Sequence, residues 1–111
     1  MSETERYPEL GQVVQILQGR EAGQFAIVIK KIDSRFVLLA DGDKRKYDRP
    51  KKKNLSHITC TEFISPEVRR SLLETGRVTN GKLRYAINKF ANEILADLKK
   101  GDQLDGERRC N

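Results

Sequence analysis

Apolar and polar positions in the first half of the chain follow the short, mostly alternating pattern of β-strands. The runs are QVVQIL, QFAIVIKKI, FVLLA and LSHITCT, at residues 12–17, 24–32, 36–40 and 55–61. Turn signals separate them, and the strongest is the Asp-Gly pair at residues 41–42. Four or five short strands joined by tight turns predict a small antiparallel barrel of SH3-like size.

After residue 64 the apolar period changes to that of α-helices. Residues 65–67, SPE, form a helix start, with serine as N-cap and proline in the first position, and Gly76 predicts the end of this helix. Asn80 is expected to cap a second helix that ends at Lys100, before Gly101. Its apolar stripe, too long to be left in water, comprises Leu83, Ile87, Phe90, Ala91, Ile94, Leu95 and Leu98.

The chain is therefore expected to be mainly β with an α extension. We predict an N-terminal tail at residues 1–6, the barrel at residues 7–62, a two-helix extension at residues 63–100, and a tail at residues 101–111 with too little apolar content to fold.

Several classes of protein are not expected from this sequence. It has no run of about 18 apolar residues that would span a membrane. Its N-terminus lacks the apolar segment of a secretory signal. Cys60 and Cys110 are too few for a disulfide framework. We expect a cytoplasmic protein with reduced thiols.

Positive charge is concentrated in one place. The chain has 22 basic and 16 acidic residues, a net charge of +6. Residues 44–53, KRKYDRPKKK, hold seven basic residues and Asp48, so this basic segment alone accounts for the whole excess. Such asymmetry indicates a polyanionic partner, whereas a merely solubilising surface intersperses both signs.

Four explanations compete for the basic segment: a solvated surface, a targeting signal, a membrane-surface anchor and a nucleic-acid interface. An anchor would need an amphipathic helix or a lipidation site, and a nuclear-localisation signal fits poorly in a folded hairpin. Nucleic acid is favoured because Lys and Arg neutralise phosphates and release counterions, and Pro50 would stiffen the segment. Tyr47 is either a base-stacking residue or a barrel-face aromatic with its hydroxyl in water.

The run GQVVQILQGREAGQFAIVI at residues 11–29 resembles a KOW motif, in which a glycine-containing loop joins two strands. With the segment DGDKRKYDRPKKKN, the chain over roughly residues 7–60 resembles the KOW-containing large-subunit ribosomal proteins of archaea and eukaryotes, and most of all their small bacterial RNA-binding relatives. The resemblance implies an SH3-like barrel that binds ribosomal RNA. The loop that would contact RNA comprises Gln18, Gly19, Arg20, Glu21, Ala22 and Gly23, in which Glu21 departs from the basic or neutral residue often found in the family.

We therefore predict a non-catalytic, ribosome-associated RNA-binding protein that is a monomer when free and needs no cofactor or metal. The sequence offers no nucleophile–base pair, P-loop or metal-ligand set, and His57 is the only histidine. Lysines and arginines would contact phosphates, and Asn54 a sugar or base. The predicted RNA-binding residues are Gln18, Gly19, Arg20, Gly23, Lys44, Arg45, Lys46, Tyr47, Arg49, Lys51, Lys52, Lys53, Asn54 and His57.

A second hypothesis is a transcription-elongation or assembly factor. In that case the barrel and the second helix would dock a protein partner, either a ribosomal protein or one associated with RNA polymerase. A DNA-binding helix-turn-helix is disfavoured, because the connection TGRVTNGK is longer than the usual turn.

Overall fold

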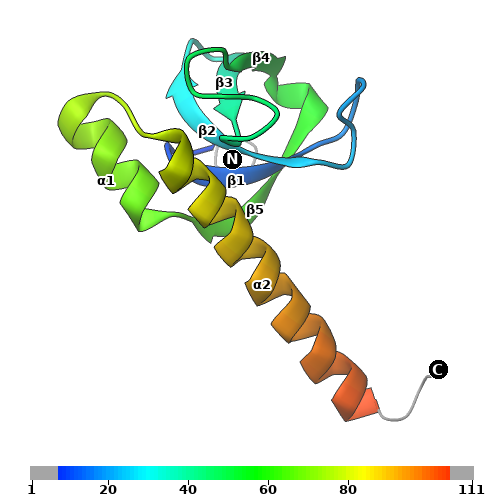
Figure 1. The fold of residues 1–111 in the computed structure, drawn as a ribbon. Helices are drawn as coiled ribbons and strands as arrows, with labels where there is room; N and C mark the ends of the chain where they lie inside the picture. Colours follow the sequence, from blue (N-terminus) through cyan, green and yellow to red (C-terminus); the bar gives the residue numbers. More distant parts are fainter. Residues whose placement is uncertain (1–7, 106–111) are drawn as a thin grey trace.

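The computed structural model describes residues 8–105, with side chains as far as residue 94, and shows a β-sheet followed by two helices (Figure 1). The predicted architecture, mainly β with a helical extension, is confirmed. The elements are β1 (Gln12–Ile16), β2 (Phe25–Lys31), β3 (Phe36–Ala40), β4 (Lys51–Asn54), the 3₁₀ helix η2 (Leu55–His57), β5 (Ile58–Ile64), α1 (Pro66–Thr75) and α2 (Asn80–Asp105).

The five strands form one antiparallel sheet in the order β4-β3-β2-β1-β5. Strands β4 and β5 lie at opposite edges, yet only the three residues of η2 separate them in the chain. In a flat sheet these edges would be about 19 Å apart. The four residue steps from Asn54 to Ile58 span at most roughly 14 Å. The sheet must therefore curl, which gives the small barrel-like form expected from the sequence.

Both faces of the sheet are apolar and buried. One face lines the inside of the curled sheet, with Val14, Ile16, Ala26, Val28, Val37, Leu39 and Ile58. The other face supplies Val13, Ile27, Ile29 and Ala40 to a second cluster, in which they pack against Val68, Leu72, Val78, Leu83, Ala86 and Phe90 of the helical half. The barrel and the helices share this second cluster, so their side chains form one continuous core. The division of the chain into a barrel and an extension near residue 63 therefore stays a prediction.

The start and end of α1 follow the sequence signals. The Ser65 hydroxyl accepts a hydrogen bond from the Val68 N–H, and proline occupies the first turn. Gly76 adopts a left-handed conformation with φ of 79°, and its N–H donates to the Leu72 carbonyl. These contacts satisfy backbone groups that a helix end otherwise leaves unpaired.

The start of α2 differs in one detail from the prediction. The helix begins at Asn80, but the cap is Thr79, whose hydroxyl accepts a hydrogen bond of 3.1 Å from the Lys82 N–H. The Asn80 side chain accepts instead from the Tyr47 N–H, at 2.7 Å. Asn80 has the right chemistry to cap a helix, but here its side chain accepts from a distant donor instead. The preceding residue, Thr79, therefore becomes the cap.

Two other expectations about elements are wrong, and one strand was not located by the sequence. Residues 55–57 form η2 rather than the start of a strand, because the Asn54 side chain accepts from the Ser56 N–H and caps a short helix. Residues 51–54, KKKN, form strand β4, which their low strand propensity did not indicate. Helix α2 does not end before Gly101 but continues to Asp105, since a glycine within a helix costs only about 1 kcal/mol.

Parts of the predicted tails cannot be compared with the structure. Residues 1–7 and 106–111 lie outside the described residues, and so do the side chains of Leu95 and Leu98. Within the described part of the chain, no helix is long and apolar enough to cross a membrane.

Phe90 lies at the centre of the contact between α2 and the sheet. Its side chain is 6% exposed, and its ring meets Phe25 edge-on at a centroid distance of 4.9 Å. A second aromatic neighbour, Phe63 at the end of β5, lies 5.8 Å away. Burial of this ring is the main apolar link between the middle of α2 and the strands.

We predict that Phe90→Ala lowers the free energy of unfolding by about 3–5 kcal/mol, because it removes a buried ring and leaves a cavity. Urea denaturation followed by circular dichroism measures this change. Tyr85→Ala, on the same helix but 54% exposed, is the control and should change stability by less than about 0.5 kcal/mol. Equal effects of the two substitutions would contradict the assignment of the buried face.

Candidate nucleic-acid interface

The basic segment begins in a closed turn. The Asp41 carboxylate accepts hydrogen bonds of 2.9 Å from the backbone N–H groups of Asp43 and Arg45. The N–H groups of Asp41 and Gly42 both donate to the Arg45 carbonyl, at 2.9 and 3.0 Å. Gly42 has φ of 82°, a conformation that glycine adopts at low cost. The Asp-Gly signal therefore marks a turn, as predicted, and the cations that follow it start from an ordered backbone.

Tyr47 attaches the basic segment to the helices. Its N–H donates to Asn80, and its hydroxyl donates to the Gly76 carbonyl at 3.1 Å. The ring packs against the cluster shared by sheet and helices. A further link joins α2 to the turn, since Arg84 donates to the Gly42 carbonyl at 2.7 Å. The Tyr47 hydroxyl thus has an acceptor within the protein, and the half-buried side chain has a structural role in joining the basic segment to the helices.

The three lysines of β4 do not form a single patch. In the pairing of β4 with β3, Lys51 and Lys53 lie opposite Leu39 and Val37, which face the inside of the curled sheet. Residues directly opposite each other project to the same face, and successive residues alternate between faces. Lys52 therefore projects to the other side of the sheet edge. Lysines on an edge strand also discourage pairing with another chain, which is a structural reason for their presence.

Lys53 is tied to the β1–β2 loop, defined here as residues 17–24. Its Nζ atom donates to the Gln18 carbonyl at 3.0 Å. A Cβ atom added at Gly19 would lie 2.9 Å from this nitrogen, and Gly19 and Gly23 have φ of 102° and 91°. The loop that resembles the KOW loop thus contacts the basic segment directly and needs glycine at both positions for its backbone conformation.

A salt bridge forms the second link between the loop and the basic segment. The Arg45 guanidinium contacts the Glu21 carboxylate at 2.8 Å, and these side chains are 35% and 26% exposed. Glu21, which departs from the family pattern, therefore has a structural partner. Arg45 is committed to this pair, and its Nε atom is buried with no acceptor among the described residues. We accordingly assign Arg45 to holding the loop rather than to a free phosphate contact.

The predicted site residues divide into two groups. The side chains that help to build the site are half-buried, and the Asn54 side chain, as the cap of η2, accepts from the backbone N–H of Ser56. His57 ends η2, where its carbonyl accepts from the Leu17 N–H at the start of the β1–β2 loop. Half-buried are Arg45, Tyr47, Lys51, Lys53, Asn54 and His57; exposed are Gln18, Gly19, Arg20, Gly23, Lys44, Lys46, Arg49 and Lys52.

Two neighbours of Lys52 were missed by sequence reasoning. The Lys52 ammonium lies over the Phe36 ring, 4.6 Å from its centroid, and the exposed Arg35 precedes that ring. The pairing of Phe36 with Asn54 brings this turn beside the end of β4. In the sequence, the only signal for these two neighbours of Lys52 is an arginine followed by an aromatic residue next to a turn. This signal is weak unless the pairing of β3 with β4 is known.

Asp33 stabilises this turn through its ionised form. Hydrogen bonds from the Arg35 N–H and the Phe36 N–H, together with the charges of Lys52 and Arg35, lower the pKa of the Asp33 carboxyl below its ordinary value. Because the folded-state pKa is depressed, this stabilisation is present above the ordinary pKa and is lost as pH falls through the folded value.

Over part of its length the chain is similar in sequence to a named protein of Bacillus subtilis. It is 59% identical over 44 residues to the protein named "Putative ribosome-binding protein YbzG" from Bacillus subtilis (strain 168). The matched residues are 40% of this chain and 60% of that relative, so the chain spans less than two thirds of the relative's length. No protein-family model matches the chain, and the KOW assignment stays a resemblance.

We predict that Glu21 and Arg45 are energetically coupled. Glu21→Gln and Arg45→Gln should each lower stability, and the double variant should lose less than the sum, with a coupling of about 0.5–1 kcal/mol for a partly exposed pair. Urea denaturation of the four proteins measures the coupling. Strictly additive effects would mean that the pair does not hold the two segments together.

Proposed function

We propose that the protein binds RNA without catalysing a reaction, and that this RNA is part of the ribosome. The observation that carries the proposal is the position of the excess charge. Exposed Lys44, Lys46, Arg49 and Lys52 project from an ordered segment beside the β1–β2 loop, which adds exposed Arg20. The similarity to a protein named for ribosome binding supports the ribosome as the site of action, and with it a cytoplasmic location.

The arrangement suits recognition of a phosphate backbone. Lys and Arg side chains that neutralise phosphates release counterions, which gives affinity that depends strongly on salt and little on sequence. The hydrogen bonds of Asp41 and Tyr47 hold the backbone of the segment before RNA arrives. A preorganised surface loses less entropy on binding than a flexible one, and more of the interaction energy then appears as affinity.

The protein-docking hypothesis keeps one supporting observation. Helix α2 extends well beyond the sheet (Figure 1), so its distal part is placed to meet a partner. Sedimentation distinguishes the two hypotheses. Release from ribosomes by salt or ribonuclease supports RNA binding, and continued association with RNA polymerase after nuclease treatment supports a transcription factor.

We predict that the triple variant Lys44→Gln, Lys46→Gln, Arg49→Gln binds RNA more weakly. On a labelled single-stranded RNA oligonucleotide, the slope of log affinity against log salt should become shallower by about two units, since each lost contact removes roughly 0.7. Fluorescence anisotropy at several salt concentrations measures both quantities. Thermal unfolding should change little, because these side chains are exposed.

The matched control removes three exposed cations outside the segment, through Lys30→Gln, Arg69→Gln and Arg70→Gln. It should retain nearly parental affinity, because its charges belong neither to the basic segment nor to the β1–β2 loop. If both triple variants lose the same affinity, only net charge matters. If neither loses any, the basic segment is a solvated face and the proposal is wrong.

A further inference from the structure

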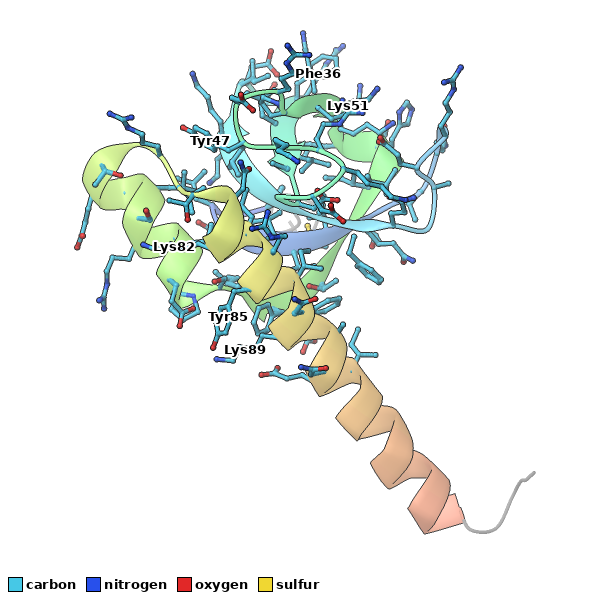
Figure 2. The ribbon with its side chains drawn as sticks, in the orientation of Figure 1. Phe36, Tyr47, Lys51, Lys82, Tyr85 and Lys89 are labelled. Atoms are coloured by element: carbon cyan, nitrogen blue, oxygen red, sulfur yellow. The ribbon has the colours of Figure 1, made fainter. Side chains whose placement is uncertain are left out.

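One face of α2, away from the core, carries an exposed lysine, Lys82, a half-buried lysine, Lys89, and an exposed aromatic ring. Leu83, Ala86 and Phe90 are buried on the side toward the sheet. Lys82, Tyr85 and Lys89 are spaced three and four residues apart, which places them on one side of a helix. Figure 2 shows the three side chains projecting to the same side, and Tyr85 is 54% exposed.

The chemistry of this face matches that of a nucleic-acid contact. Among the described residues no carboxylate forms a salt bridge with Lys82 or Lys89. The two lysines are about 10 Å apart along the helix axis, with the tyrosine between them. Such an array can place an ammonium against a phosphate on each side of an unpaired base, while the ring stacks on that base. A single exposed tyrosine would need no explanation, but its position between two cations favours a polyanionic partner.

The contacts of the basic segment fix this face relative to the first interface. Tyr47 bonds to Gly76 and Asn80, and Arg84 bonds to Gly42, all within the first turns of α2 or just before them. The approach is so close that a Cβ atom on Gly42 would lie 2.4 Å from the Asn80 carbonyl oxygen. The turn and the helix therefore move as one body.

We propose that the face of α2 formed by Lys82, Tyr85 and Lys89 is a second RNA-binding surface, held at a fixed position relative to the basic segment. The proposal rests on the RNA binding proposed above and extends it to a separate part of the molecule. Its partner is a folded RNA large enough to reach both surfaces. The basic segment contacts α2 only at its start, near Asn80, so a short single strand bound there would leave Tyr85 and Lys89, further along the helix, uncovered.

The test uses the full-length protein with two probes, protein-free ribosomal RNA and a short single-stranded oligonucleotide. On ribosomal RNA, Lys82→Gln with Lys89→Gln should make the salt slope shallower by about 1.4–1.8 units. Tyr85→Ala should lower affinity about tenfold with the slope unchanged. On the oligonucleotide, both variants should match the parent. Lys30→Gln with Lys31→Gln, an equal loss of charge on β2, is the control and should match the parent on both probes.

Ultraviolet crosslinking gives a readout that does not depend on affinity. Crosslinks to ribosomal RNA should map to the peptide containing Tyr85 as well as to the basic segment. If the parent binds ribosomal RNA and the α2 variants bind it like the control, this inference is wrong while the proposed function stands. If the α2 variants bind free RNA normally but no longer sediment with ribosomes, the face contacts a protein and the inference is also wrong. If the parent binds neither probe, the proposed function itself fails.

Discussion

The packing of α2 and α1 on the outer face of the sheet is the contact on which the other features depend. Strand β2 is buried on both sides, so its run FAIVI needs the helices as well as the inside of the curled sheet. Without the helices, Val13, Ile27 and Ile29 would face water, and each large apolar side chain would forgo about 1.5–3 kcal/mol of burial. The helical half is therefore part of the fold, and it also provides the attachment points for the basic segment.

That attachment explains how a dense group of cations can be ordered. Like charges repel, and a flexible loop would relieve the repulsion by spreading. Here Arg45 is neutralised by Glu21, Lys53 bonds to a carbonyl of the β1–β2 loop, and Lys52 projects to the opposite face of β4 from Lys51. Some of the positive charges thus serve the architecture, and the exposed remainder is available to a ligand. The count of seven basic residues in the sequence therefore overstates the number free to contact a ligand.

The sequence was informative where a local interaction decides the structure. Ser65 and Gly76 mark the ends of α1 because capping depends only on nearby backbone groups. It was misleading where a distant partner decides. Asn80 and Tyr47 bond to each other across 33 residues, and no local pattern links them. Strand β4 is formed by pairing with β3 despite its lysines, while Gly101 shows that a glycine permits a helix end without requiring one.

The same distinction applies to the interface. Composition identified the basic segment, since net charge is a property of the sequence alone. It could not identify which cations are free, because that depends on the register of β4 and on the contacts of the β1–β2 loop. Tyr47 illustrates the consequence: an aromatic ring among lysines resembles a stacking residue, yet its hydrogen bonds to Asn80 and Gly76 join the barrel to the helices. Tyr85 also lies between basic residues but is exposed on α2, and it is therefore the residue that we propose for stacking.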